Sequence, residues 1–215
     1  EAAFLELCQR AGISVSTLAG ADTLCCGTPW SSKGLPSGLD AMRELVESAV
    51  REAPPHAVFV SDASSCTEGY RKLLQDSGRR VVDSVTIIAE ALDRLPVDKK
   101  LQQVVVHPTC SGEKLGSTAD LMRIAGHLAE DVVVAPDWNC CGFAGDRGML
   151  HPELTASATS VMAEQLRQVD ADAFVSSNRT CELGMTRAVG SEFIGVLGLL
   201  ATLTAEQGEK EVAKP

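Results

Sequence analysis

The sequence lacks a hydrophobic run long enough to cross a bilayer. Its longest strongly apolar run, residues 193–205, covers about 13 residues and contains two glycines, whereas a spanning helix needs roughly 20 apolar residues. Positive charge is also scarce, because 19 basic side chains face 29 acidic ones and the net charge is −10. This balance argues against nucleic acid or an anionic membrane surface as the main partner. We therefore expect no transmembrane segment and no nucleic-acid partner.

Several catalytic motifs are missing as well. The sequence contains no phosphate-binding glycine loop, no nucleophile elbow and no pair of carboxylates that spacing alone singles out. The chain opens with EAAFLELCQR, without an initiator methionine, a basic segment or the apolar core of a signal peptide. These absences leave no catalytic residue to assign, and they predict a fragment of a longer cytoplasmic polypeptide.

What the sequence does have is cysteine. Eight cysteines are present, and two Cys-Cys-Gly triplets stand in TLCCGTPW and NCCGFAGD. They allow two interpretations, a disulfide framework or a metal or redox site. Adjacent cysteines make poor disulfide partners, because neighbouring Cα atoms lie about 3.8 Å apart and a relaxed bridge wants roughly 5.5–6 Å. Large chains without a secretory signal also depend less on disulfides, so the pattern favours a metal or redox site.

The rest of the sequence predicts an α/β fold with mostly parallel sheets. Short apolar segments typical of buried parallel strands stand at residues 13–18, 57–61, 104–106, 132–135 and 173–176. Between them, apolar residues at three-and-four spacing predict amphipathic helices, for example over residues 39–50 and 154–169. Alternation of this kind indicates strands covered by helices.

The cysteines also reveal an internal repeat. Cys26 and Cys66 are 40 positions apart, as are Cys141 and Cys181, so the two sets are offset by 115 positions. A repeat of this size indicates duplicated subdomains. We predict two pseudo-symmetric halves, residues 1–100 and 101–205, with the Cys-Cys-Gly loops at strand ends and a disordered tail at residues 206–215. The counterpart of Cys110 would fall at position −5, so we also expect a cysteine just upstream of this chain.

Each half offers thiolates for a metal centre. The second set is Cys110, Cys140, Cys141 and Cys181, and the first is Cys25, Cys26 and Cys66. Four thiolates satisfy either an iron–sulfur cluster or a structural zinc ion. Lys33 and Arg147 follow the two cysteine pairs and could offset the excess negative charge, while His107 ends a predicted strand and could donate to a cluster sulfur. Cys8 lies in a helical pattern and is expected to be an ordinary buried cysteine.

These motifs resemble a known family. The segments TLCCGTPWSSKGL, VVVHPTC, NCCGFAGDRGML and SSNRTCE are similar to the cysteine-rich CCG domain found in heterodisulfide reductase and in the glycolate oxidase iron–sulfur subunit. The chain looks most like the C-terminal part of FAD-linked D-lactate or D-2-hydroxyacid dehydrogenases. The resemblance implies electron transfer through iron–sulfur clusters of the 4Fe-4S type. It also implies a flavin domain and a ferredoxin-like domain upstream, which would supply the electrons.

One departure from the family pattern narrows the cofactor. The full pattern ends in Cys-x-x-Cys, but Ala63 and Asn178 stand at the first of these positions. Each half can then supply four cysteine ligands and not five, which leaves a four-cysteine cluster or zinc. The alternatives are a zinc–thiolate structural module and a thiol–disulfide reductase. We expect a cytoplasmic protein, with the inner face of the membrane as a second location. The 2-hydroxyacid, the electron acceptor and the oligomeric state are not determined by the sequence.

Overall fold

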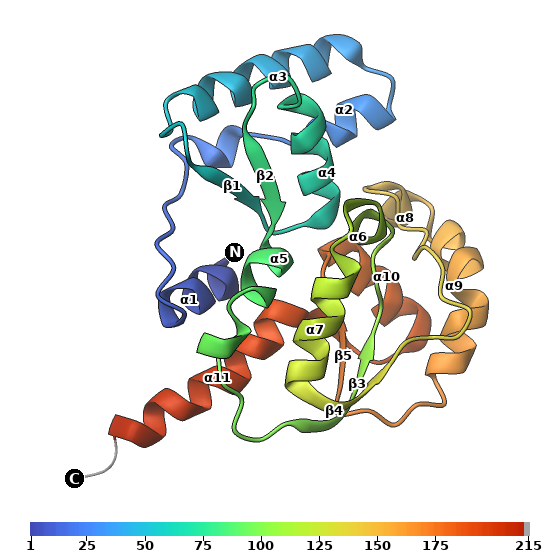
Figure 1. Cartoon of the computed structure of the whole chain (residues 1–215). Coiled ribbons are helices and arrows are strands. Elements are labelled where there is room, and N and C mark those ends of the chain that lie inside the picture. Colours follow the sequence, from blue (N-terminus) through green and yellow to red (C-terminus); the bar gives the residue numbers. More distant parts are fainter. Residues whose placement is uncertain (213–215) are drawn as a thin grey trace.

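A computed structural model describes the backbone of residues 1–212 and the side chains of residues 1–204. Figure 1 shows the first half of the chain above the second. The first half contains α1 (Ala2–Arg10), η1 (Ala21–Thr23), α2 (Thr28–Ser32), α3 (Pro36–Arg51), β1 (Val58–Ser61), α4 (Ser64–Leu73), β2 (Arg80–Asp83), α5 (Ser84–Ala89) and η2 (Leu92–Arg94). The second contains β3 (Leu101–Val106), α6 (Cys110–Leu115), α7 (Thr118–Leu128), β4 (Ala129–Val133), α8 (Arg147–Leu150), α9 (Pro152–Leu166), β5 (Ala173–Ser176), α10 (Arg179–Val189), β6 (Phe193–Gly195) and α11 (Val196–Val212).

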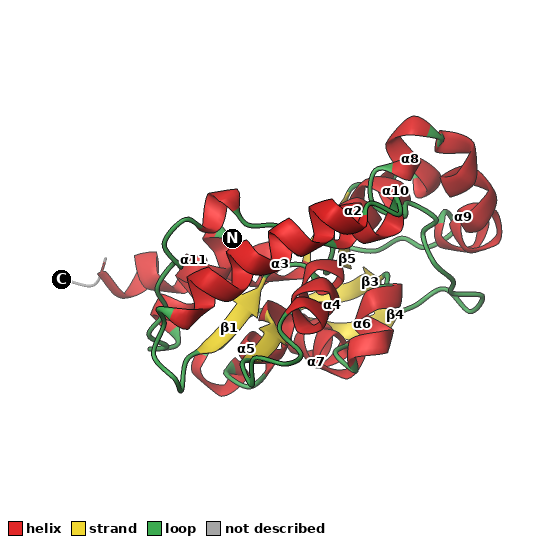
Figure 2. Cartoon of the chain, turned by 90° about the horizontal axis from the view of Figure 1, so that it is seen from above, coloured by secondary structure: helices red, strands yellow, loops and turns green. Residues whose placement is uncertain are grey.

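Two separate parallel sheets form the centres of the halves. The first sheet pairs β1 with β2, and the second has the order β4-β3-β5-β6. All strand pairs among the described residues are parallel, and Figure 2 shows helices on both sides of the strands. The predicted α/β class with parallel sheets is confirmed.

The elements of the two halves repeat at the spacing of the cysteines. β1 and β5 occupy positions that differ by the same 115 residues as Cys66 and Cys181, and α4 and α10 begin 115 residues apart. The long helices α3 and α9 each begin with proline at the first helical position, where its fixed φ suits the first turn. The repeat therefore governs helices and strands as well as cysteines.

The strand predicted at residues 13–18 is wrong. These residues are an irregular segment, whereas the segment 115 positions later is β4. β4 is held by pairing with β3, and no residues of this sequence correspond to β3 at that spacing. An apolar segment without a neighbouring strand has no partner for its backbone groups, so it does not become a strand. β2 and β6, which were not predicted, complete the sheets instead.

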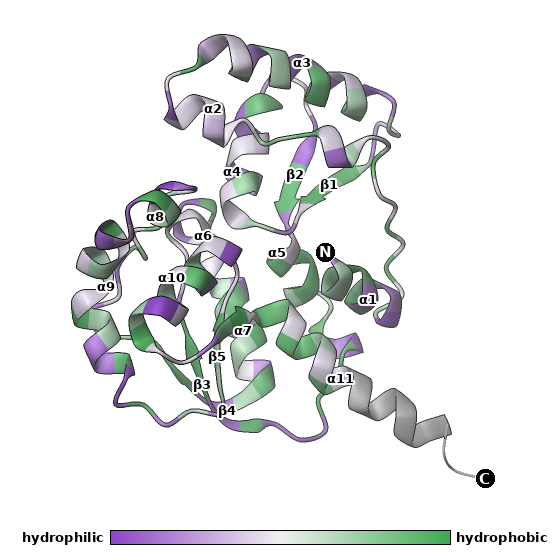
Figure 3. Ribbon diagram, turned by 180° about the vertical axis from the view of Figure 1, so that it is seen from behind, coloured by the Kyte–Doolittle hydropathy of each residue, from purple (hydrophilic) through white to green (hydrophobic). Residues whose placement is uncertain are grey.

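A large apolar cluster joins the halves. It contains buried residues of α1 (Leu7), α5 (Ile88), α7 (Ile124) and α11 (Leu200), together with Val104 of β3. Helix α1 packs on α11, while α5 packs on α7, so each half contributes helices to the other. Figure 3 colours α5 and the strands β3 and β5 as mainly hydrophobic. A second cluster fills the space between β5, α9 and α10, and a third lies between α3, α4 and β2.

The predicted tail falls partly on a described helix. The backbone of α11 extends through Val212, and residues 213–215 lie outside the described residues. None of the helices in the described part of the chain combines the length and apolar character that a membrane span requires.

Candidate metal centre

Three separate segments bring the second cysteine set together. Cys110 is the first residue of α6, Cys181 lies in the first turn of α10, and Cys140 and Cys141 lie in the loop before α8. Both helices follow the carboxyl end of a strand, β3 or β5, and these strands are neighbours in the sheet. Their first turns therefore meet at one sheet edge, which is the usual location of ligand sites in open α/β sheets.

The four sulfurs form a contiguous group. Sγ of Cys110 lies 3.7 Å from Sγ of Cys140, and Sγ of Cys141 lies 3.1 Å from Sγ of Cys181. Cys141 and Cys181 are buried, while Cys110 is exposed and Cys140 is half-buried. All eight cysteines belong to the described residues, and none of them is in a disulfide. The group is thus a set of free thiols, half buried and half accessible.

Hydrogen bonding within this group separates the acidities of the thiols. The hydrogen bond with Cys110 strongly lowers the pKa of Cys140, and the same contact raises that of Cys110. Likewise the contact with Cys141 lowers the pKa of Cys181, with a smaller contribution from the nearby His107. Thiolates are the form that binds metals, so the arrangement favours deprotonation at Cys140 and Cys181 first.

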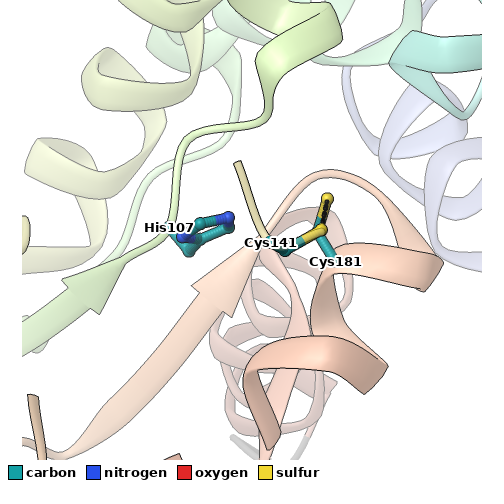
Figure 4. A group of neighbouring side chains, drawn as sticks. All are labelled: His107, Cys141 and Cys181. Carbon is teal, nitrogen blue, oxygen red and sulfur yellow. Dashed lines mark hydrogen bonds between the residues drawn. The ribbon is translucent and has the colours of Figure 1, made fainter. Parts of the chain in front are cut away.

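His107 points at the buried end of this group (Figure 4). Its ring nitrogens and the sulfurs of Cys141 and Cys181 supply one ligand atom each, and these three atoms lie within 4.8 Å of one another. The ring is 2% exposed, and its Nε2 has no hydrogen-bond partner among the described residues. A buried nitrogen without a partner is costly, which is the condition expected where a metal or cluster sulfur would bind.

The loop around the cysteine pair is shaped by glycine and aromatic residues. Gly142 has φ of +68° and lies against α9, where a Cβ would come within 2.7 Å of the Ala158 Cβ. The glycine is therefore required by helix packing as well as by its left-handed backbone. The backbone N–H of Gly142 donates to Sγ of Cys140 at 3.5 Å. Trp138 donates from Nε1 to the Pro108 carbonyl at 2.8 Å, which ties the loop to the strand end that carries His107.

The first cysteine set has the same arrangement with one member fewer. Cys26 and Cys66 are in hydrogen-bond contact, which lowers the pKa of Cys26 and raises that of Cys66. The Cys26 thiol also donates to the Thr28 hydroxyl at 3.4 Å, and the Cys25 N–H lies 3.1 Å from the Met42 sulfur. The structure thus brings Cys25, Cys26 and Cys66 together. Among the described residues, a histidine joins the cysteines only in the second set.

The two predicted basic residues lie outside the sulfur groups. The ammonium of Lys33 binds the Asp146 carboxylate at 2.7 Å, and both side chains are about half exposed. This ion pair joins the loop after the first cysteine pair to the loop after the second, and it lowers the pKa of Asp146. Arg147 is exposed at the first residue of α8 and makes no hydrogen bond to a cysteine among the described residues.

Sequence reasoning missed the polar residues between the two sets. The hydroxyl of Ser64 lies 2.9 Å from that of Thr109 and 2.6 Å from that of Ser111. Asn178 donates from Nδ2 to the Ser65 hydroxyl at 3.2 Å. These residues immediately precede or follow Cys66, Cys110 and Cys181 in the chain, or stand one turn away. The only sequence signal was that Asn178 replaces a cysteine of the family pattern, and the structure uses it as a bridge between the halves.

Comparison with known proteins agrees with the cysteine pattern. Residues 104–186 match the CCG family, described as a cysteine-rich domain, and this segment contains the whole second cysteine set. One subunit of the fumarate reductase (CoM/CoB) of Methanothermobacter marburgensis is 25% identical over 200 residues, which cover 90% of this chain and 40% of that protein. The uncharacterized protein YkgE of Escherichia coli K12 is 24% identical over 180 residues, 75% of this chain and 74% of YkgE. The chain therefore spans about 40% of the first of these relatives.

Proposed function

Because residues 104–186 match the cysteine-rich CCG domain, we propose that this chain is an electron-transfer domain whose second cysteine set holds an iron–sulfur cluster. The observation that carries the proposal is the convergence of four free cysteines from three segments, with sulfur–sulfur separations of 3.7 and 3.1 Å. The expected ligands are Cys110, Cys140, Cys141 and Cys181. Similarity to a protein of a fumarate reductase supports a redox context.

The donor set fits such a group. Four thiolates are the usual ligands of a 4Fe-4S cluster, which supplies one-electron transfer when bound. The protein would hold it from the edge of the sheet, with Cys141 and Cys181 on the buried side and Cys110 on the accessible side. Gly142 donates its N–H to the Cys140 sulfur, and His107 offers a buried nitrogen beside two others. Donors to the sulfurs stabilise the negative charge that four thiolates bring.

The first cysteine set is the proposed location of a second centre. Cys25, Cys26 and Cys66 are in place, and a cysteine before residue 1 stays the predicted fourth ligand. The start of the described chain lies close by, because the Glu1 amino group is 2.9 Å from the carboxylate of Asp62, which follows β1. Lys33 and Arg147 keep their proposed role as cationic residues of the two cysteine loops.

We further propose that the electrons come from a flavin domain of the same polypeptide, which oxidises D-lactate or a related 2-hydroxyacid. The support is the resemblance of the two Cys-Cys-Gly segments to such dehydrogenases. The direct test is reduction of the second centre by D-lactate in the complete polypeptide, followed in the visible spectrum. If dithionite reduces the centre and D-lactate, L-lactate and glycolate do not, the 2-hydroxyacid proposal fails while the electron-transfer proposal stands.

A zinc–thiolate module is the second candidate. His107, Cys141 and Cys181 form a group that suits a single tetrahedral ion, and this specific geometry favours the alternative. The deciding experiment is the content of iron, zinc and acid-labile sulfide in protein purified without oxygen. Iron with matching sulfide and broad visible absorbance supports the cluster, whereas colourless protein with stoichiometric zinc and no sulfide replaces it with the structural role.

A further inference from the structure

An open groove lies between the two halves, away from the cysteines. It has a volume of about 450 Å³, and its walls include Arg71, Arg79 and Arg80 from the first half and Leu115, Gly116 and Asp120 from the second. Cys66 stands near the start of α4 and Cys110 at the start of α6, whereas Arg71 and Leu115 stand near the ends of these helices. The groove and the cysteine groups therefore occupy opposite ends of the same helix pair.

The groove is positively charged in an acidic protein. The chain as a whole carries a net charge of −10, yet three arginines line this groove against a single carboxylate, that of Asp120. Asp120 is itself engaged, because it accepts from the Thr86 hydroxyl at 2.8 Å and lies 3.6 Å from the Arg123 guanidinium. A cleft lined by one sign of charge concentrates ions of the opposite sign.

Two of the three arginines have donors to spare. Nε of Arg71 donates to the Val81 carbonyl at 2.9 Å, which holds the guanidinium against β2, and no partner for its Nη1 and Nη2 is found among the described residues. Arg80 has no hydrogen bond or ion pair within the described chain. Arg79 differs, because its two Nη atoms donate to the Pro54 and Ala53 carbonyls at 2.6 and 3.0 Å. Arg79 thus contributes charge, while Arg71 and Arg80 contribute hydrogen-bond donors.

The bond from Arg71 also decides what kind of ligand the groove takes. β2 is an edge strand, and an edge with free carbonyls can accept a further strand. Here the Arg71 side chain already satisfies the outward carbonyl of Val81. The groove is thereby closed to strand addition and open to side-chain recognition. Guanidinium groups with free Nη atoms bind the paired oxygens of a carboxylate or a phosphate.

We propose that this groove binds a small oxyanion, carrying a phosphate or carboxylate group, through the guanidinium groups of Arg71 and Arg80. The bound anion would contact the first half through these arginines and the second half at the corner between α6 and α7. It would therefore link the two halves at the end of the helix pair opposite the cysteines. The site is independent of the metal centre and of the proposed electron transfer.

Isothermal titration of the metal-free chain with inorganic phosphate and, separately, with succinate tests the proposal. We expect saturable binding of one anion per chain that weakens as the salt concentration rises. Tighter binding of phosphate identifies a phosphate ligand, and tighter binding of succinate identifies a dicarboxylate. Absence of saturable binding by both anions overturns the proposal.

Variants then locate the site. Arg80→Gln should weaken binding about tenfold or more, because it removes a charged donor. Its side chain is exposed and without partners, so the fold should not change, and the circular dichroism spectrum checks this. Lys72→Gln is the matched control: it removes the same charge from α4, but Lys72 pairs with Glu68 on the outer surface and does not line the groove. Equal losses in the two variants would show a general charge effect and overturn the assignment.

Discussion

Cys141 holds the most enclosed position in the second cysteine set. It is 3% exposed, and its sulfur lies 3.1 Å from that of Cys181. We expect Cys141→Ser to lose nearly all metal from this set, because a hydroxyl is a poor substitute for a thiolate ligand. Metal and sulfide content measure the effect. Cys8→Ala is the control, since Cys8 is equally buried but lies in α1 within the apolar cluster, and metal retained in Cys141→Ser at the level of this control would refute the ligand assignment.

Asp83 should make stability depend on pH. It is 2% exposed, accepts from the Val85 N–H at 3.0 Å and the Thr67 hydroxyl at 3.2 Å, and burial raises its pKa. A raised folded pKa gives stability that is present at acid pH and is lost as the pH rises through that pKa. Asp83→Asn removes this loss, and its amide can donate to Thr67, whose hydroxyl also reaches the Ala63 carbonyl.

Urea unfolding at several pH values measures this effect. The stability of Asp83→Asn relative to the natural protein should rise as the pH increases above about 4, near the ordinary carboxyl pKa. A difference that stays constant with pH would show that Asp83 does not titrate in this range. Glu153→Gln serves as a control, because Glu153 is exposed at the start of α9.

At the scale of elements, two equivalent glycines predict different outcomes. Gly69 of α4 packs so closely on the first cysteine loop that a Cβ would meet the Cys26 carbonyl oxygen at 2.5 Å and the Cys26 Cβ at 2.9 Å. At Gly184 of α10, 115 positions later, the nearest atom would be Cδ2 of Phe143 at 3.3 Å. Gly69→Ala should lower the free energy of unfolding by about 1–3 kcal/mol through overpacking.

Gly184→Ala is the matched control for this prediction. Alanine favours the helix by up to about 1 kcal/mol, and the side-chain neighbours at Gly184 lie at the edge of ordinary contact. We expect a change within about 1 kcal/mol of the natural protein. Chemical unfolding of both variants measures the difference, and equal effects would contradict the closer packing of α4 on its loop.

The strands show how far the sequence predicts the fold. β1, β3 and β5 are short apolar segments next to helical periodicity, and this local signal was sufficient. Residues 13–18 carry the same signal but are irregular, because a strand needs a neighbour and local sequence does not report one. β2 begins with an exposed arginine and ends with the buried Asp83, so it lacked the apolar signal and was missed.

The candidate site shows the same division. The repeat of 40 positions identified the cysteines, since metal ligands are residue types with a visible spacing. The hydroxyls of Ser64, Thr109 and Ser111 left no such signal, because serine and threonine at helix starts are common as caps. Their meeting depends on how α4 and α6 pack across the halves, which is a tertiary property.

For the whole molecule, the shared apolar cluster predicts unfolding in one step. Helix α1 of the first half packs on α11 of the second, and Leu7 of α1 is fully buried there. Leu7→Ala should cost about 2–5 kcal/mol and destabilise both halves equally. The two tryptophans report the halves separately, because Trp30 lies in the first and Trp138 in the second.

Fluorescence of Trp30→Phe and Trp138→Phe, each with and without Leu7→Ala, provides the measurement. Coincident unfolding midpoints in the two single-tryptophan proteins, both shifted by Leu7→Ala, are the expected result. If the midpoint reported by Trp138 stays fixed while that reported by Trp30 falls, the halves unfold independently and the shared cluster does not couple them.

The bridges between the halves carry a record of ancestry. Shifting by 115 positions places Gly148 opposite Lys33 and Ser31 opposite Asp146, and it places Ala63 opposite Asn178. An ancestor built from two identical halves would have made each bridge twice, yet the ion pair of Lys33 and the amide bond of Asn178 each occur once among the described residues. These contacts arose after the duplicated halves had diverged. Each half has since become a specialised partner of the other, and neither copy can take the place of its twin.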